Sequence, residues 1–348
     1  MCISPNFYPL VLQKESGKKK IIFQLPYTIN YRDDLENLSQ FADECKKACI
    51  GFGSNASLVK YLSGKKYEFL KMVSVPCGIC QDCLKSHARD WAVRIMAESK
   101  AHEKNWFITL TYDNDHIPSD GMLVKDEISK FNKKLKVYLK RAGLKSDFRF
   151  FGVGEYGGIT FRPHYHVIYF GLEIPDLQFH QKSDNGDLVF TSKFLENVWS
   201  KGFITIGDVS PASASYVARY CDKKRILSAA EKKRLKEAGF VPEFNVMSRM
   251  PGIGSNFTDK IVENVVSQCY TINMKGLNAG VPMFYQKKLK GGLLDSKQLE
   301  FYESERLKLI NFSINENIRK SELMNSTMFE SLNSSDELKK SARKKRGL

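Results

Sequence analysis

Two histidines and a glutamate stand at a spacing that suits a bound metal ion. His164 and His166 lie two positions apart in a run of β-forming residues, so on a strand both imidazoles face the same side. Glu155 follows the preceding predicted strand and reaches the pair if the two strands form a hairpin. Two imidazoles and a carboxylate suit Mg²⁺ or Mn²⁺. Two alternatives stay open: a His-x-His pair also arises by chance, and a glutamate there also fits a plain turn.

Two tyrosines and an amine share one face of a predicted helix. Tyr216, Tyr220 and Lys224 are each four positions apart, and Lys223 lies close to the same stripe. A phenol is a weak nucleophile at neutral pH and needs a nearby cation, together with an electrophile polarised by a metal. The spacing therefore fits nucleophilic chemistry by tyrosine, with either lysine assisting. It also fits two tyrosines that pack on a sheet with their hydroxyls at its rim.

A third cluster consists of cysteines. Cys77, Cys80 and Cys83 lie at a turn before a predicted helix. Structural zinc takes four ligands, so we expect Zn²⁺ here, with Cys2 as the fourth ligand and His87 as the alternative. Free thiols are the other interpretation. Three cysteines also fit an iron–sulfur cluster, but nothing else in the sequence indicates redox chemistry.

The charge of the chain indicates the class of partner. Over 348 residues the formal net charge is +15. Such an excess of Lys and Arg favours a polyanion, because these side chains release counterions from phosphates. A basic protein with no nucleic-acid partner is the alternative. No run of about 18 apolar residues occurs, so we expect no membrane partner, and the N-terminus lacks the apolar segment of a signal peptide. There is no P-loop, so we expect no fused helicase.

The elements that position these residues follow from hydrophobic periodicity. Apolar residues at helical spacing predict helices over 81–103, 125–142, 193–200 and 213–224, the last with Ser213 or Ser215 as its N-cap. Runs of β-branched and aromatic residues predict strands over 106–112, 148–153, 164–171 and 203–206. This order predicts an α+β fold, an antiparallel sheet with helices packed on one face.

Three segments in this order resemble the motifs of the HUH rolling-circle initiators: Phe107–Tyr112, Arg162–His166 and Tyr216–Lys224. More closely, the chain is similar to the replication initiation proteins of small single-stranded DNA phages, the Microviridae of gokushovirus type. Three further segments support the resemblance: Val75–Cys80, Gly154–Gly157 and Met247–Gly254. The similarity covers about residues 75–260.

The resemblance implies a domain organisation. The HUH endonuclease core, with an RRM-like antiparallel sheet, would occupy residues 105–260. A small cysteine-rich element and a helix would lie in residues 1–104. Residues 261–348 would form a helical, charged region with a basic tail, which we expect to be disordered.

The resemblance also implies a reaction. His164 and His166, with Glu155, would hold Mg²⁺ or Mn²⁺, which polarises the scissile phosphate of single-stranded or melted origin DNA. Tyr216 or Tyr220 would attack, leaving a 5′-phosphotyrosine and a free 3′-hydroxyl as primer. The other tyrosine would later cut the regenerated origin, and the released 3′-hydroxyl would close the circle without ATP. The implied partners are a host DNA polymerase and helicase, and the implied setting is the cytoplasm of a bacterial host.

Two other functions compete with this one. A plasmid relaxase or an HUH transposase mostly works with one essential tyrosine or a different motif order, which the Tyr-x3-Tyr pair argues against. A non-catalytic zinc-containing DNA-binding regulator would explain the charge and the cysteines. It would leave the histidine pair and the tyrosine pair unexplained.

Overall fold

The computed structural model describes most of the chain. The described residues are 6–21, 67–183, 186–221, 229–268, 271–274, 277–306, 308 and 319. Contacts divide the chain into two compact units, residues 1–83 with 310–348, and residues 84–309. The domain limits expected from the sequence stay a prediction. None of the helices in the described part combines the length and the apolar character needed to span a bilayer.

The first unit contains a three-stranded antiparallel sheet in the order β2-β1-β3. Its strands are β1 (Asn6–Gln13), β2 (Lys19–Ile21) and β3 (Tyr67–Val75). The cysteine cluster follows β3 directly.

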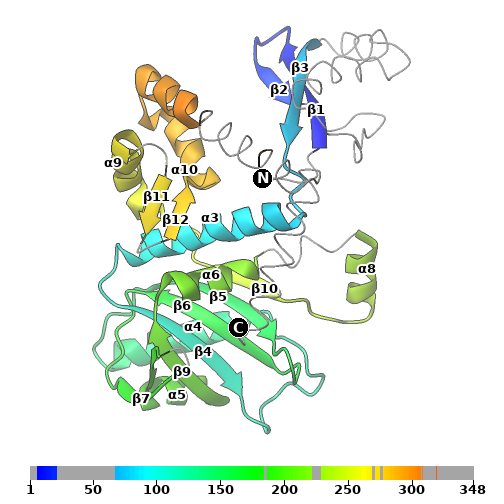
Figure 1. The fold of residues 1–348 in the computed structure, drawn as a ribbon. Coiled ribbons are helices and arrows are strands. Elements are labelled where there is room, and N and C mark those ends of the chain that lie inside the picture. The colour runs from blue at the N-terminus through cyan, green and yellow to red at the C-terminus, as the bar shows by residue number, and fades with distance from the viewer. Residues whose placement is uncertain are drawn as a thin grey trace. The chain divides into compact units, whose positions relative to one another are not determined.

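The second unit is built on a seven-stranded antiparallel sheet in the order β10-β5-β6-β4-β9-β8-β7 (Figure 1). Its strands are β4 (Asn105–Tyr112), β5 (Arg149–Tyr156), β6 (Pro163–Phe170), β7 (Gln178–Lys182), β8 (Leu188–Thr191), β9 (Gly202–Asp208) and β10 (Phe244–Met247). A separate hairpin pairs β11 (Thr271–Met274) with β12 (Leu277–Gly280). The predicted α+β class is therefore confirmed.

Helices connect and cover these strands. They are α3 (Gln81–Ser99), α4 (Glu127–Arg141), α5 (Lys193–Trp199), α6 (Pro211–Arg219), α8 (Ala229–Glu237), α9 (Thr258–Gln268) and α10 (Met283–Lys288). Two short turns complete the set, the 3-10 helix η1 (Ser255–Phe257) and the π-helical η2 (Leu289–Leu293).

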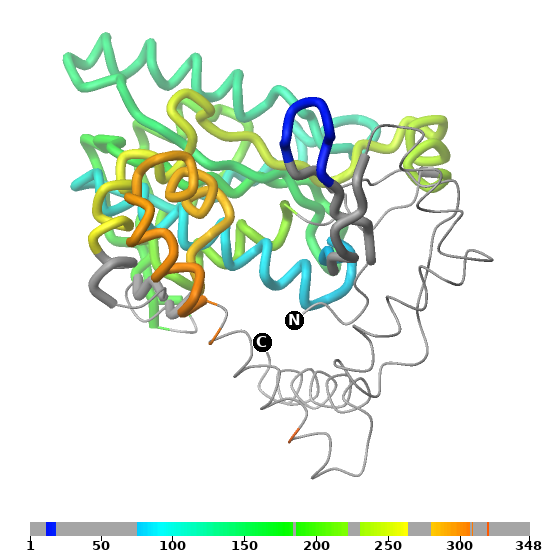
Figure 2. The backbone as a smooth tube through the Cα atoms, turned by 90° about the horizontal axis from the view of Figure 1, so that it is seen from above, coloured from blue at the N-terminus to red at the C-terminus, as the bar shows by residue number. Residues whose placement is uncertain are grey.

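The central strands are buried on both faces, and each face has its own core. On one face Trp91 of α3 packs on Phe151 of β5, with ring centroids 5.3 Å apart, and residues of α6, α9 and α10 join this core. Figures 1 and 2 both show α9 and α10 beside α3. On the other face Phe131 of α4 packs against Trp199 of α5. The expectation of helices on one face is wrong, because central strands this apolar need cover on both sides.

The start of α6 corrects a second expectation. Ser210, not Ser213 or Ser215, is the N-cap, and its side chain accepts a hydrogen bond from the backbone N–H of Ser213. The Ser213 hydroxyl in turn accepts from the Ser210 N–H, which completes a capping box, and Pro211 takes the first helical position. The helix therefore begins earlier than predicted, because a proline at that position starts a helix.

Strands β7 and β8 have no counterpart among the predicted elements. Every residue of β7 is exposed, so no apolar alternation reveals it. It pairs only with β8 and forms the edge of the sheet, where pairing rather than burial defines the strand.

Gly202 at the start of β9 is a position that only glycine fits. Its φ is 138°, and an added Cβ would lie 2.3 Å from the backbone nitrogen of Asp113 and 2.4 Å from the carbonyl oxygen of Thr111. Both contacts are to backbone, which cannot swing aside. We expect Gly202→Ala to lower the free energy of unfolding by more than about 3 kcal/mol, measured by chemical denaturation.

Gly158 provides the control for this substitution. An added Cβ there meets nothing within 4 Å, so Gly158→Ala should change stability by less than about 0.5 kcal/mol. Equal stability of the two variants would contradict the steric argument.

Candidate metal and tyrosine site

The register of three strands assembles a polar cluster on one face of the sheet. Glu155 of β5 lies opposite His164 of β6, and His166 lies opposite Thr109 of β4. Directly opposed residues in antiparallel strands point to the same face, so these four side chains form two adjacent rows. The hairpin on which the predicted metal site depended is therefore present. Glu155 lies within β5 and is 4% exposed, which is not the setting of a turn residue.

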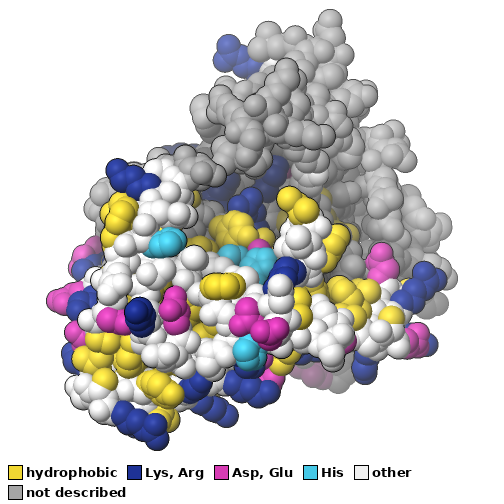
Figure 3. All heavy atoms as spheres, turned by 90° about the horizontal axis from the view of Figure 1, so that it is seen from below, with side chains coloured by type: hydrophobic (Ala, Val, Ile, Leu, Met, Phe, Trp, Pro, Cys, Tyr) yellow, Lys and Arg dark blue, Asp and Glu magenta, His cyan; other side chains and the backbone are white. Residues whose placement is uncertain are grey.

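One carboxylate oxygen is the centre of the cluster. Glu155 Oε1 lies 2.7 Å from His164 Nε2 and 3.1 Å from His166 Nε2. Burial alone raises the pKa of this carboxyl, but the hydrogen bonds with the two histidines outweigh burial and hold the pKa well below its usual range. Glu155 is therefore a buried anion. Figure 3 shows histidine side chains that are open to solvent near the middle of the face drawn there.

The protonation of His164 shows that this anion needs a cation. The Arg162 carbonyl can only accept, so His164 Nδ1, 3.1 Å away, carries a proton and donates it. A lone pair on Nε2 would then repel the Glu155 oxygen at 2.7 Å. A second proton or a metal ion removes that repulsion. The pKa of His164 agrees, because the interaction with Glu155 outweighs the lowering by burial and raises it.

The donor set fits a small divalent cation. The ligand atoms of Glu155, His164 and His166 all lie within 4.8 Å of one another. In an octahedral site with bonds of about 2.1 Å, neighbouring ligand atoms lie about 3.0 Å apart, close to the two distances from Glu155 Oε1. The other oxygen, Oε2, is buried and has no hydrogen-bond partner within the described ranges. It is thus a further ligand atom in reach.

Both predicted tyrosines lie at this cluster. The Tyr216 hydroxyl donates to Glu155 Oε1 at 2.7 Å and lies 3.5 Å from His166 Nε2. The Tyr220 hydroxyl donates to the Tyr216 hydroxyl at 3.1 Å. The Tyr216 ring also meets Phe107 and His166 edge-on. Two phenols one helical turn apart thus form a short hydrogen-bonded chain that ends on the carboxylate.

The surroundings keep both phenols protonated. Burial, with the hydrogen bond to Glu155, raises the pKa of Tyr216 to about 12 against the opposing effects of Tyr220 and Arg219. Burial and the same carboxylate also raise the pKa of Tyr220 above its ordinary value. A phenol in this position becomes a better nucleophile when a cation neutralises the carboxylate beside it.

The predicted assisting lysines, Lys223 and Lys224, lie outside the described residues. A cation that the sequence argument missed is Arg219, whose guanidinium carbon lies 5.6 Å from the centre of the Tyr216 ring. It was missed because helical spacing of three and four residues drew attention to the lysines further along.

Thr109 was also missed. Its hydroxyl lies 2.9 Å from His166 Nδ1, on the side of the ring away from Glu155. A hydrogen bond to one ring nitrogen fixes the orientation of the imidazole and the tautomer that presents the other nitrogen. Only the strand register reveals this contact, because Thr109 and His166 lie 57 positions apart.

The cysteine cluster has the geometry of a metal knuckle. The sulfur atoms of Cys77 and Cys83 lie 4.0 Å apart, close to the sulfur separation of about 3.8 Å that tetrahedral zinc requires. The backbone N–H of Cys80 donates to the Cys77 sulfur, and Gly78 turns the chain with a φ of 78°. Cys2 lies outside the described residues. His87, the alternative fourth ligand, lies on α3 with its ring edge-on to Trp91.

The fold and the site together define a class of protein: an antiparallel α+β core whose sheet carries a candidate metal centre beside paired tyrosines. The family model of the replication-associated proteins of ORF2 type matches residues 105–225, which include both. The chain belongs to the replication-associated proteins of single-stranded DNA phages of the Microviridae type.

Three relatives are similar over much of their length. Replication-associated protein ORF2 of Spiroplasma virus 4 is 33% identical over 264 residues, which cover 74% of this chain and 79% of that protein. Replication-associated protein VP4 of Bdellovibrio phage phiMH2K is 34% identical, with coverage of 68% and 73%. Replication-associated protein ORF4 of Chlamydia phage 1 is 30% identical, with coverage of 56% and 48%. No solved structure is significantly similar to the chain.

Thr109→Val tests the hydrogen bond to His166. Valine keeps the shape of the side chain and removes the hydroxyl, so His166 loses the contact that orients it. We expect the dissociation constant for Mn²⁺, measured by calorimetry, to rise about 10- to 100-fold. Thr205→Val is the control, because Thr205 lies directly opposite Thr109 on β9 but is exposed. Unchanged Mn²⁺ binding in Thr109→Val would rule out this orienting role.

Metal analysis tests the cysteine cluster. We expect purified protein to contain about one equivalent of zinc, and Cys80→Ser to contain less than about half an equivalent. Cys221→Ser is the matched control, because Cys221 lies outside the cluster, and it should retain the zinc. Equal zinc content in the two variants would contradict a site at Cys77, Cys80 and Cys83.

Proposed function

We propose that the protein initiates rolling-circle replication by cutting one strand of origin DNA with a tyrosine and later rejoining it. One observation carries the proposal. The Tyr216 hydroxyl lies 2.7 Å from Glu155 Oε1 and 3.5 Å from His166 Nε2, with the Tyr220 hydroxyl 3.1 Å away from it. Membership in a replication-associated family and the net charge of +15 support the same conclusion.

Glu155, His164 and His166 would hold Mg²⁺ or Mn²⁺, and a divalent ion supplies Lewis-acid polarisation of a phosphate oxygen when bound. The protein itself would place the nucleophile. The rings of Phe107 and His166 support Tyr216 on its two sides, so that its oxygen faces the cluster. Holding nucleophile and phosphate together removes much of the entropic cost of their reaction.

Tyr216 would make the first cut, because its oxygen lies nearer the cluster than that of Tyr220. Its oxygen forms a bond to phosphorus as the bond to the 3′-oxygen breaks, which leaves a 5′-phosphotyrosine and a free 3′ end. Glu155 Oε1 already accepts the phenol hydrogen bond, so it is the nearest acceptor for the phenol proton. The departing 3′-oxygen takes a proton from solvent. A host polymerase would extend the resulting 3′-hydroxyl, with a host helicase opening the duplex.

Tyr220 would make the second cut. Its hydroxyl is hydrogen-bonded to that of Tyr216, so it can take the neighbouring place once Tyr216 carries DNA. The newly released 3′-hydroxyl attacks the first phosphotyrosine and restores the Tyr216 phenol. The number of phosphodiester bonds is conserved in each exchange, so rejoining needs no ATP.

The open part of the sheet beside the cluster offers a place for the strand. Phe203 of β9 lies opposite Thr111, which lies opposite His164, so all three point to the same face. Phe203 is 66% exposed, and an exposed aromatic ring is a surface on which a base stacks.

A covalent-adduct assay with single-stranded origin DNA and Mn²⁺ tests the proposal. We expect wild-type protein to form an adduct that survives SDS, and Tyr216→Phe to form it at least about a thousandfold more slowly, because phenylalanine lacks the nucleophilic oxygen. Tyr220→Phe should form the first adduct but no closed circle. Tyr138→Phe, on α4, is the control and should behave as wild type.

Two outcomes would overturn the assignment. An SDS-stable adduct in the Tyr216→Phe/Tyr220→Phe double variant would place the nucleophile elsewhere. Tight DNA binding by wild-type protein without any adduct would favour a zinc-containing regulator.

A further inference from the structure

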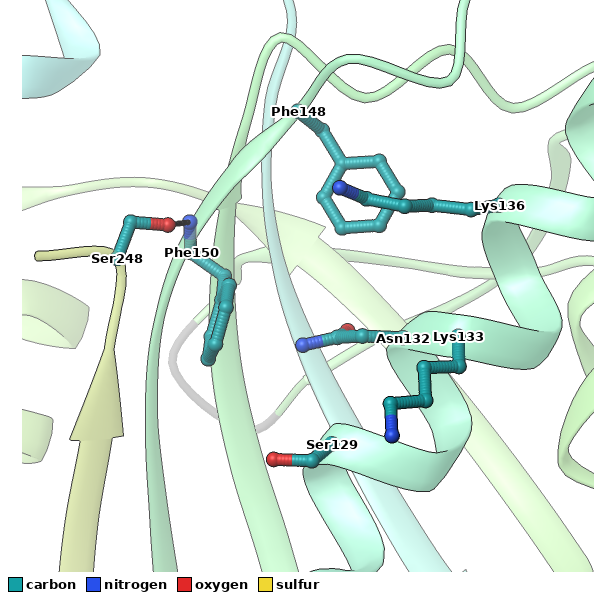
Figure 4. A pocket seen from close by; sticks show the side chains of 7 residues that line it. All are labelled: Ser129, Asn132, Lys133, Lys136, Phe148, Phe150 and Ser248. Carbon is teal, nitrogen blue, oxygen red and sulfur yellow. Dashed lines mark hydrogen bonds between the residues drawn. The ribbon is translucent and has the colours of Figure 1, made fainter. Parts of the chain in front are cut away.

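A second polar recess lies between α4 and the start of β5. Its volume is about 230 Å³, and Figure 4 shows the side chains that line it. Phe150 lies five positions before Glu155 on β5, which corresponds to about 17 Å along the strand. An odd separation also places Phe150 on the opposite face of the sheet. The recess is therefore distinct from the metal and tyrosine site.

Helix α4 supplies hydrogen-bond donors to the recess. Ser129, Asn132, Lys133 and Lys136 recur at intervals of three and four residues, so they share one face of the helix. None of the residues that line the recess is acidic. A pocket lined by two ammonium groups, with no carboxylate to balance them, suits an anion.

Asn132 adds a polar group with unused hydrogen-bonding capacity. It is 7% exposed, and its Oδ1 accepts a hydrogen bond from the Tyr169 hydroxyl at 2.6 Å. Its Nδ2 has no hydrogen-bond partner within the described part of the chain. In Figure 4 this nitrogen points across the recess towards Phe150. A buried donor without a partner costs about 1–3 kcal/mol, which an acceptor in the recess would recover.

The opposite wall of the recess is aromatic and held in place. The backbone N–H of Phe150 donates to the Ser248 hydroxyl at 3.1 Å, and the Ser248 N–H donates to the Phe150 carbonyl at 3.0 Å. Lys136 Nζ lies 5.4 Å from the centre of the Phe148 ring, which fixes the ammonium over that wall. Phe150 is half-buried, so part of its ring faces the recess. Cations beside an aromatic surface recognise a phosphate joined to a base.

The charge of α4 is concentrated for this purpose. The helix carries six basic residues and one acidic residue, Glu127, which pairs with Lys201 outside the helix. Lys130 pairs with Asp126, and Lys134 donates to the Ser200 hydroxyl. Lys133 and Lys136 have no carboxylate within 4.0 Å among the described residues. These two lysines therefore keep their full charge for a ligand.

We propose that this recess binds a nucleotide unit of a DNA segment other than the one being cut, with a backbone phosphate on Lys133 and Lys136 and a base against Phe150. The inference rests on the proposed action on DNA. It adds that the protein holds DNA on both faces of its sheet, so that a strand leaving the cut site has a second point of attachment.

DNA binding by the full-length Tyr216→Phe/Tyr220→Phe protein tests the proposal. Without these tyrosines no covalent capture contributes, so a failure of the cutting chemistry leaves this measurement intact. The affinity for single-stranded oligonucleotides of increasing length is measured by fluorescence anisotropy at several salt concentrations. We expect Lys133→Gln/Lys136→Gln to lower the affinity for long oligonucleotides about tenfold or more. The slope of log affinity against log salt should fall by about 1.4, or about 0.7 for each lost phosphate contact.

Lys130→Gln/Lys134→Gln is the matched control. It removes the same charge from the same helix at residues that do not line the recess, and we expect less than a roughly twofold loss of affinity and no change in slope. Phe150→Leu should lower the affinity at least about fivefold without changing the slope, because stacking is lost and charge is kept. Thermal unfolding of each variant shows whether the fold is intact.

Two results would overturn the proposal. The first is an equal effect of the two lysine pairs, because the recess would then be only part of a diffuse basic surface. The second is saturable binding of deoxyadenosine monophosphate that needs Lys133 and Lys136 while the affinity for DNA does not. The recess would then hold a free nucleotide rather than DNA.

Discussion

The site depends on one buried anion. Glu155 Oε1 accepts from the Tyr216 hydroxyl and lies against both His164 and His166, so a single oxygen holds three functional side chains within reach of each other. A carboxylate that is 4% exposed is stable only with compensating positive charge. The two imidazoles and a cation provide that compensation. Binding of a cation and placement of the nucleophile are therefore linked through the same group.

The sheet provides the precision that this anion requires. Glu155, His164 and Thr109 come from three adjacent strands, and a slip of one residue in any pairing would turn a ligand to the opposite face. Two separate cores prevent such a slip, because each face of the central strands is packed by its own helices. Packing on the far face, which has no part in the chemistry, thus fixes the register on the near face.

The two faces of the sheet differ in what their helices leave open. On the near face, α6 covers β6 and brings Tyr216 to the cluster, while Phe203 of β9 stays exposed. On the far face, α4 packs its apolar stripe on the sheet and turns Lys133 and Lys136 towards a recess. One amphipathic helix therefore contributes both to the core and to a charged surface. A protein that acts on a long polyanion gains from such contacts spread over its surface, because each adds to affinity without altering the reacting centre.

The sequence by itself determined the α+β class, the principal strands and helices near the site, and the residue types that gather there. Periodicity reports these features because it depends on which side chains are apolar. It did not reveal β7, whose residues are all exposed, or the N-cap at Ser210, and it placed helices on one face of the sheet only. Only the tertiary structure decided that Glu155 is buried against both histidines, that Thr109 orients His166, and that Arg219 lies beside Tyr216. The physical reason is that these contacts join residues on different strands and helices, and the register that brings them together is set by packing across the whole sheet rather than by any local pattern.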